Sequence, residues 1–229
     1  MNLQGYQKLT LLDFPGKVAC TVFTGGCNLK CPFCHNASLV LSPNEYKSAE
    51  EDIFLYLKSR KGIIDGVCIT GGEPLLQPDI EDFIIKVRAL GYAVKLDTNG
   101  SYPDRLKALL DKNLLDYIAM DIKSSKESYS LLCGKEVNIN DIAKSVEIIK
   151  SGNIPYEFRT TAVKSLHTKK DFYNIGLWLK GAKQYFIQEF VDSGNLIKDG
   201  LCGFTKPEMQ ELLNEVQQNI PEAQLRGLD

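Results

Sequence analysis

Short runs of β-branched and other apolar residues alternate along the chain with longer stretches in which apolar residues recur every three or four positions. The short runs have the composition of buried strands, which we expect at residues 18–24, 67–70, 93–97, 117–121, 157–163 and 185–190. The longer stretches have the period of amphipathic helices and include residues 46–57 (beginning at Tyr46), 80–90, 142–149, 172–179 and 209–216. The chain is therefore predicted to alternate strand and helix six times.

This alternation predicts a parallel sheet, because successive parallel strands are joined by crossover helices. Two architectures satisfy the pattern, a doubly wound open sheet and a complete or partial (β/α) barrel. A closed barrel of eight units typically needs about 250 residues. Six units within 229 residues therefore favour an α/β fold of the open, partial (β/α)6 TIM-like barrel type with parallel strands. In both architectures the functional residues gather at the carboxyl ends of the strands.

The chain shows no linker, low-complexity tract or internal repeat, so we expect one domain over residues 1–229. We divide it into an N-terminal segment (1–17), a barrel core (18–205) and a C-terminal helix and tail (206–229). The 27 basic residues are interspersed with 29 acidic ones, which argues against nucleic acid as a partner. No apolar run approaches the ~20 residues that span a bilayer, and the N-terminus lacks a signal-peptide pattern. We therefore expect a cytoplasmic protein that does not bind membranes.

Three of the seven cysteines, Cys27, Cys31 and Cys34, are clustered and are candidate metal ligands. An odd cysteine count in a reducing compartment argues against a disulfide framework. Structural zinc takes four nitrogen or sulfur ligands, and the chain offers no fourth at a familiar spacing, since a ligating His35 directly after Cys34 would be strained. A [4Fe–4S] cluster usually takes four thiolates, so three cysteines would leave one iron open. We therefore favour such a cluster over an incomplete zinc site.

The other four cysteines are scattered and show no C-x₂-C spacing. We therefore expect no second cluster. We interpret Cys20 and Cys68 as core residues and assign no role to Cys133 and Cys202.

Polar residues follow or end the predicted strands one after another, and all would meet at one end of the sheet. Each could have a simpler explanation, because Asn-Gly favours a turn and an Asp–Lys pair can be a surface salt bridge. Arg159 lies within a strand, where an unpaired guanidinium would be costly to bury; it faces either a ligand or a structural ion-pair partner. Together these residues form a candidate site: Gly71, Gly72, Glu73, Asp97, Thr98, Asn99, Asp121, Lys123, Arg159, Gln188 and Glu189.

The cysteine spacing C-x₃-C-x-aromatic-C, with Phe33 as the aromatic residue, resembles the signature of the radical S-adenosylmethionine (SAM) enzymes. Thr70-Gly71-Gly72-Glu73-Pro74 resembles the second motif of that family. Asp13-Phe14-Pro15-Gly16 and Cys34-His35-Asn36 more closely resemble the activating enzymes of glycyl radical proteins. Within that group the chain is most similar to the activating proteins of anaerobic ribonucleoside-triphosphate reductase, in the branch related to pyruvate formate-lyase activating enzyme.

This resemblance implies an oxidoreductase in which Cys27, Cys31 and Cys34 are the catalytic ligands of a [4Fe–4S] cluster and SAM binds the open iron. It places the SAM amino group beside the Gly-Gly-Glu segment, and its carboxylate and ribose beside the Asp and Lys residues of the later strands. Where relatives supply a histidine to the ribose, Gln188 is the expected substitute. A monovalent cation between Asp97 and Asp121 is a further hypothesis. The expected SAM contacts are Phe33, His35, Gly71, Gly72, Glu73, Asp97, Thr98, Asn99, Asp121, Lys123, Arg159 and Gln188.

The implied reaction is reductive cleavage of SAM, followed by removal of a hydrogen atom from a glycine of a partner glycyl radical enzyme. The electron would come from a flavodoxin- or ferredoxin-type donor. The segment 1–17, through Asp13 and Gly16, is expected on the side of the protein substrate. Two rival interpretations stay open: a small-molecule radical SAM enzyme of the 7-carboxy-7-deazaguanine synthase type, and a non-catalytic zinc-binding interaction module.

Overall fold

The protein is described by a computed structural model, which covers residues 1–43 and 49–228, so that Tyr46 of the predicted first helix lies outside the described residues. Its strands are β1 (Leu3–Thr10), β2 (Ala19–Thr24), β3 (Gly66–Gly71), β4 (Ala93–Thr98), β5 (Tyr117–Asp121), β6 (Tyr156–Ala162), β7 (Tyr185–Glu189) and β8 (Gln224–Arg226). The helices are α1 (Ala37–Leu41), α2 (Glu50–Ser59), α3 (Ile80–Ala89), α4 (Pro103–Asp111), α5 (Tyr129–Cys133), α6 (Ile139–Ser151), α7 (Lys169–Trp178) and α8 (Lys206–Gln217), with a 3₁₀ turn η1 (Pro74–Leu76).

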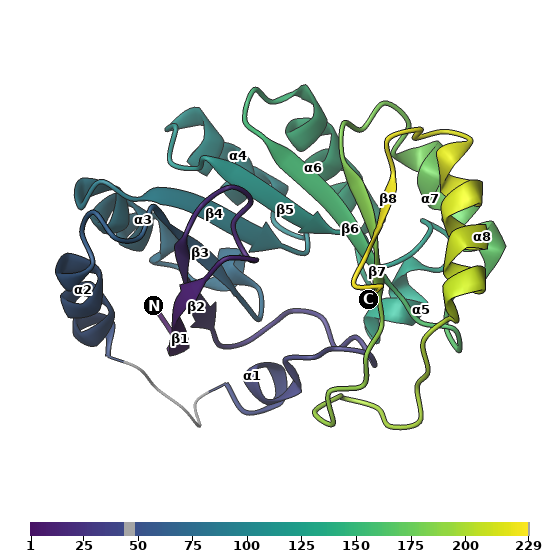
Figure 1. Ribbon diagram of the computed structural model, residues 1–229, viewed down its shortest axis with the longest axis horizontal. Coiled ribbons are helices and arrows are strands. Elements are labelled where there is room, and N and C mark those ends of the chain that lie inside the picture. Colours follow the sequence, from purple (N-terminus) through teal and green to yellow (C-terminus); the bar gives the residue numbers. More distant parts are fainter. Residues whose placement is uncertain (44–48, 229) are drawn as a thin grey trace.

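All these strands form one sheet, in which each strand pairs with its neighbours in the sequence from β1 to β8. The pairs from β2 to β8 are parallel, whereas β1 is antiparallel to β2. Because strand order never reverses, the longer helices lie along one side of the sheet, and the sheet curves away from them (Figure 1). The first and last strands are not paired with each other. The fold is thus the predicted open α/β barrel and not a doubly wound sheet.

The six predicted strands are β2 to β7, and the two edge strands were missed. The predicted N-terminal segment contains β1, and the predicted C-terminal tail contains β8. In β1 the residues Gln7, Lys8 and Leu9 are exposed, so its sequence lacks the continuous apolar run of a buried strand. β8 has only three residues, too few for a periodic pattern. The short helices α1 and α5 were missed for the same reason.

Apolar and polar side chains alternate along the parallel strands, so the sheet has an apolar outer face and a polar inner face. Side chains of the outer face pack against the helices and form the main core; they include Val22, Ile69, Leu96, Met120, Phe158 and Ile187. Full burial of each such side chain contributes about 1.5–3 kcal/mol. The intervening positions carry Thr21, Cys68, Lys95, Asp97, Asp121, Glu157 and Arg159. The concave face of the sheet is therefore a charged surface held in shape by an apolar layer behind it.

Phe14 closes the inner face at the amino ends of the strands. It packs with Ala19 and Tyr117 in a small separate cluster, and a Cβ atom on Gly66 would lie 2.9 Å from its ring. The polar part of the inner face is thus bounded at this end by aromatic side chains. Within the described residues, no helix has the length and hydrophobicity needed to cross a membrane.

Candidate active site

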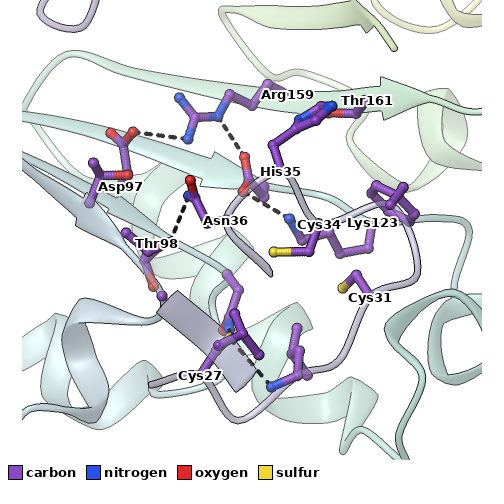
Figure 2. A pocket seen from close by; sticks show the side chains of 18 of the residues that line it. Cys27, Cys31, Cys34, His35, Asn36, Asp97, Thr98, Lys123, Arg159 and Thr161 are labelled. Carbon is purple, nitrogen blue, oxygen red and sulfur yellow. Dashed lines mark hydrogen bonds and ion pairs between the residues drawn. The ribbon is translucent and has the colours of Figure 1, made fainter. Parts of the chain in front are cut away.

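A cavity of about 330 Å³ lies at the carboxyl ends of the parallel strands. This volume is in the usual range for small-molecule sites. The three clustered cysteines and the charged residues of the later strands surround the same space (Figure 2). The lining residues are Cys27, Leu29, Cys31, Phe33, Cys34, His35, Asn36, Val40, Thr70, Gly71, Gly72, Asp97, Thr98, Asn99, Asp121, Lys123, Arg159, Thr161, Gln188 and Glu189. The structure therefore brings together most of the residues predicted to form the site.

The cysteine loop between β2 and α1 is fixed by its own backbone and by neighbouring loops. The Leu29 N–H lies 3.4 Å from the Cys27 sulfur, and the Cys34 N–H donates to the Cys31 carbonyl over 3.0 Å. The Asn99 side-chain amide lies 3.7 Å from the Cys27 sulfur. The Leu29 and Asn99 N–H groups, which approach the Cys27 sulfur, are the kind of donor that stabilises a thiolate ligand.

The three clustered thiols are exposed to one cavity, as the ligands of an iron–sulfur cluster must be. Among the described residues, no three His, Cys, Asp or Glu side chains are placed to hold one metal ion. A tetrahedral zinc site needs its ligands within about 2.3 Å of the metal. A cluster instead holds its cysteines apart, because each binds a different iron. All three cysteines line one cavity; Cys27 and Cys34 are half-buried and Cys31 is buried. This arrangement suits the ligands of an iron–sulfur cluster.

Gly71 and Gly72 pack against the start of the cysteine loop. A Cβ atom on Gly72 would lie 2.0 Å from the Gly26 carbonyl oxygen, and one on Gly71 would lie 2.5 Å from the backbone of Thr24. The backbone N–H groups of Gly72 and Glu73 donate to the carbonyls of Thr24 and Gly26. The two glycines are thus required by contact between two loops of the chain, a reason that the sequence did not reveal.

Glu73 is fully buried and does not line the cavity. Its carboxylate accepts hydrogen bonds from the Asn99 N–H (2.7 Å), the Thr98 hydroxyl (2.8 Å) and the Leu75 N–H (3.0 Å). Burial raises the pKa of Glu73 to about 7, although these donors oppose the shift. In this structure Glu73 holds the Asp97–Gly100 turn in place from behind the cavity, so a direct contact with SAM stays a prediction.

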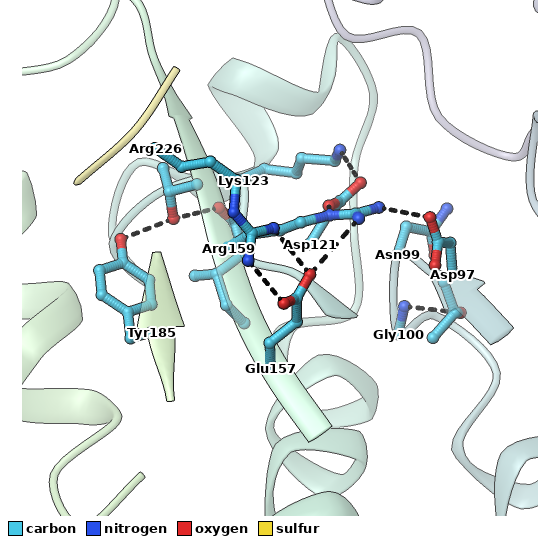
Figure 3. Close-up of polar contacts among 12 residues, drawn as sticks. Asp97, Asn99, Gly100, Asp121, Lys123, Glu157, Arg159, Tyr185 and Arg226 are labelled. Atoms are coloured by element: carbon cyan, nitrogen blue, oxygen red, sulfur yellow. Dashed lines mark hydrogen bonds and ion pairs between the residues drawn. The ribbon is translucent and has the colours of Figure 1, made fainter. Parts of the chain in front are cut away.

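Arg159 is the centre of a charge network that runs across β4, β5 and β6 (Figure 3). Its guanidinium donates to Asp121 over 2.5 Å and to Asp97 over 3.0 Å. Lys95 and Lys123 lie beyond these carboxylates, each paired with one of them. The Arg159 side chain thus joins two aspartates whose charges would otherwise repel each other.

The network keeps its members charged. Burial opposes the ionisation of Asp121, but Arg159 and Lys123 hold its pKa well below the usual range. Burial likewise opposes the charge of Lys123, yet the attraction of Asp121 raises the pKa of Lys123 above its ordinary value. The network therefore presents the carboxylates of Asp97 and Asp121 and the cations of Lys123 and Arg159 to the cavity at neutral pH, and these can bind a zwitterionic ligand.

Asp13 and Gly16 lie apart from this cavity. The Asp13 carboxylate accepts the Thr21 hydroxyl hydrogen bond over 2.5 Å, and the adjacent Phe14 packs at the amino ends of the strands. The structure thus places the Asp13–Gly16 turn toward the opposite end of the sheet from the cysteine loop. A role for Asp13 and Gly16 in binding a protein substrate stays a prediction.

Several lining or supporting residues were not predicted as site residues. The Asn36 amide donates to the Gly71 carbonyl over 3.0 Å and so ties the cysteine loop to the glycine pair. Thr161 follows Arg159 by two positions on the same face of β6, and this period of two could have identified it. His167 is only 3% exposed; it packs edge-on against Phe33 and contacts the Lys123 carbonyl over 2.8 Å.

Comparison with known proteins agrees with this geometry. Residues 21–172 match the family model described as the radical SAM superfamily. A Methanocaldococcus jannaschii protein provisionally named a glycyl-radical enzyme activating enzyme is 34% identical over 198 residues, which cover 82% of this chain and 79% of the relative. The pyruvate formate-lyase-activating enzyme of Clostridium pasteurianum is 29% identical over 155 residues, or 65% and 64% of the two chains. The 7-carboxy-7-deazaguanine synthase of Halobacterium salinarum is 36% identical over 100 residues, or 44% and 37%.

Solved structures share the architecture. A radical SAM methyltransferase from Sphaerobacter thermophilus has a TM-score of 0.73 over 95% of this chain and 68% of that chain, with 12% identity. At this level of identity the likeness shows the fold alone. It confirms the unclosed parallel sheet expected from the sequence.

Proposed function

Because this chain belongs to the radical SAM superfamily, we propose that it is an activating enzyme that removes a hydrogen atom from a glycine residue of a partner protein. The observation that carries the proposal is the cavity itself, in which three thiols and an alternating set of carboxylates and cations face one space. The similarity to activating enzymes over four fifths of the chain supports the type of reaction.

Each part of the cavity has a role in this proposal. Cys27, Cys31 and Cys34 would hold a [4Fe–4S] cluster, and Asp121 and Lys123 would meet the amino acid and ribose groups of SAM. When bound, the cluster and SAM supply a carbon-centred radical that abstracts the hydrogen atom. The protein positions these groups and limits the access of water, which matters because such a radical attacks most nearby C–H bonds.

The proposed partner is an anaerobic ribonucleoside-triphosphate reductase, and the proposed electron donor is a flavodoxin- or ferredoxin-type protein. The Asp13–Gly16 and Cys34–Asn36 segments resemble the activating enzymes of glycyl radical proteins as a group, and the choice of the reductase rests on the overall resemblance of the chain to its activating proteins. The unpaired edges β1 and β8 leave the barrel open, so that a loop of another protein could reach the inner face. We place this reaction in the cytoplasm, where free thiols stay reduced.

We also propose that a monovalent cation binds between Asp97 and Asp121. Arg159 already contacts both carboxylates, so a bound cation would have to share them with its guanidinium. A dependence of SAM affinity on potassium or sodium concentration at constant ionic strength would support the cation. An affinity that is the same in both salts and in choline chloride would exclude it.

The experiment that tests the activity is electron paramagnetic resonance (EPR) on partner mixtures. The protein is purified without oxygen, reconstituted with iron and sulfide, and incubated with SAM, dithionite and the candidate reductase. The proposal predicts the doublet of a glycyl radical on the reductase, and no doublet with a Cys34→Ala variant. A doublet only with another glycyl radical enzyme would overturn the choice of partner and leave the chemistry intact. A colourless protein that contains zinc would refute the activity altogether.

A small-molecule radical SAM enzyme is the second candidate function. It is favoured by the local similarity to a 7-carboxy-7-deazaguanine synthase, which covers under half of each chain. The two functions differ in what consumes the radical. If SAM is cleaved with the small-molecule substrate of such a synthase, and a new product accumulates without any protein radical, the small-molecule function is supported.

A further inference from the structure

His167 contacts both halves of the candidate active site without lining the cavity. Its ring packs edge-on against Phe33, with ring centres 6.1 Å apart, and Phe33 lies between the second and third cysteines of the cysteine loop. Its Nε2 atom lies 2.8 Å from the backbone carbonyl oxygen of Lys123. His167 thus joins the loop that carries the thiols to the loop that carries one cation of the charge network.

The hydrogen bonds of His167 fix the orientation of its ring. A carbonyl oxygen can only accept a hydrogen bond, so Nε2 is the atom that donates to Lys123. Nδ1 accepts from the Val163 N–H over 3.1 Å. The backbone is held as well, because the His167 N–H donates to the Val163 carbonyl over 2.8 Å and the capping box of α7, formed by Thr168 and Asp171, follows directly. The ring is therefore a fixed support.

The loop after β5 is held by side chains from later elements of the chain. The Thr160 hydroxyl donates to the Ile122 carbonyl over 2.7 Å, and His167 binds the next carbonyl along. The Ile122 side chain is buried in the core, whereas the Lys123 ammonium lies at the cavity, 2.9 Å from Asp121. His167 therefore fixes the backbone from which a cavity cation projects.

We propose that His167 is a positioning residue for SAM, which holds Lys123 at a fixed place relative to the cysteine loop. The inference rests on the proposed function, in which SAM is bound both by the cluster and by the charged residues. A ligand held at two places binds more tightly when the protein keeps those places at the right separation beforehand. The lysine side chain is flexible, so the placement of its ammonium depends on a fixed backbone.

The test measures the affinity for SAM in the reconstituted full-length protein without a reductant, so that no SAM is cleaved. Equilibrium dialysis with labelled SAM gives the dissociation constant, and iron is measured in each protein. His167→Phe keeps a ring beside Phe33 but forms neither hydrogen bond. His167→Gln can still reach the Lys123 carbonyl with an N–H, whereas the shorter side chain of His167→Asn cannot. We expect equal iron, SAM binding weakened about tenfold in His167→Phe and His167→Asn, and most of the affinity retained in His167→Gln.

Phe172→Leu is the control for a general loss of packing. The Phe172 ring lies 5.5 Å from that of His167, is fully buried and does not line the cavity. This variant should unfold at a lower denaturant concentration than wild type and bind SAM as wild type does. Equal weakening of SAM binding in Phe172→Leu and His167→Phe would overturn the inference.

A double-mutant cycle tests whether His167 acts through Lys123. In a Lys123→Met background, His167→Phe should cause no further loss of SAM affinity. Additive losses would show that His167 has only a structural role. SAM binding as tight in His167→Asn as in wild type, or as weak in His167→Gln as in His167→Asn, would also overturn the inference and leave the proposed function standing. A wild-type protein that binds neither cluster nor SAM would overturn the proposed function itself, and this inference with it.

Discussion

Gly72 shows how one missing side chain allows two loops to meet. With a Cβ atom it would overlap the backbone carbonyl of Gly26 at 2.0 Å, and a backbone contact cannot be relieved by rotating a side chain. We expect Gly72→Ala to lower the free energy of unfolding by about 3 kcal/mol and to reduce iron incorporation. Anaerobic urea denaturation and iron analysis measure the two effects.

Gly5 provides the matched control, because a Cβ atom there would meet no other atom within 4 Å. Gly5→Ala should change the free energy of unfolding by less than about 0.5 kcal/mol. If the two alanine variants were equally stable, contact between the loops would not be the reason for glycine at position 72.

Glu73 should make stability depend on pH. Its pKa rises from 4.5 to about 7 on folding, chiefly by burial, so between these values the folded chain binds more protons than the unfolded chain. The contribution of Glu73 to stability is therefore fully present below pH 4.5 and is lost as the pH rises toward 7, by on the order of 3 kcal/mol. Above pH 7 it should change no further.

Comparing the pH dependence of unfolding in wild type and in Glu73→Gln isolates the contribution of Glu73, because the other titrating groups are common to both proteins. We expect the difference in the free energy of unfolding between pH 5 and pH 8 to be smaller in Glu73→Gln than in wild type. Denaturant titrations at intermediate pH values give this difference. Parallel pH profiles for the two proteins would show that Glu73 titrates normally.

At the scale of elements, the short strand β8 is attached to the inner face through Arg226, which pairs with Glu157 and lies over the Phe186 ring, 3.7 Å from its centre. Arg226 forms two hydrogen bonds, of 2.8 and 2.9 Å, with Glu157, whose side chain is only 2% exposed. Glu157 also lies 3.8 Å from Arg159. An edge strand of three residues has few backbone hydrogen bonds, so this pair carries much of its attachment to the inner face.

Arg226→Met should leave the Glu157 carboxylate buried with less charge compensation. We expect a loss of about 2 kcal/mol, below the usual cost of breaking a buried pair because Arg226 is partly exposed. The double variant Glu157→Gln/Arg226→Met should recover part of this loss. A double-mutant cycle by denaturation measures the coupling; strict additivity would contradict it.

Neither edge strand could be predicted from its sequence, although the six central strands could. A central parallel strand is buried on its helix side and so carries an apolar run, as in β3 and β5. β1 and β8 are stabilised by what they pair with, β1 by the antiparallel register with β2 and β8 by Arg226. β2 follows β1 directly in the chain, whereas Glu157 is 69 residues from Arg226; neither partner leaves a pattern within the edge strand itself.

At the scale of the whole molecule, the segment after β7 returns to the cysteine loop. The Lys198 N–H donates to the Pro32 carbonyl over 3.0 Å, and the His35 ring contacts the Val191 carbonyl over 2.9 Å. His35 also stacks on Phe190, with ring centres 5.6 Å apart. Residues 190–198 therefore link the last long strand to the loop that follows the first parallel strand.

His35→Ala should loosen this link. Removing the hydrogen bond and the stacked ring costs about 1.4 kcal/mol, and we expect amide hydrogen exchange of residues 191–198 to become about tenfold faster. Exchange in α3, on the outer side of the sheet, serves as the internal reference and should not change. Equal exchange of residues 191–198 in both proteins would show that other contacts hold the segment.

The sequence by itself determined the central strands, the clustered thiols and the polar residues at the strand ends, because each depends on short-range period or spacing. Only the tertiary structure decided which of these side chains meet. It placed Arg159 between Asp97 and Asp121 and turned Glu73 away from the cavity. These contacts join residues that are far apart in the chain, and a sheet assembled from distant strands brings them together through a register and curvature that no local pattern encodes.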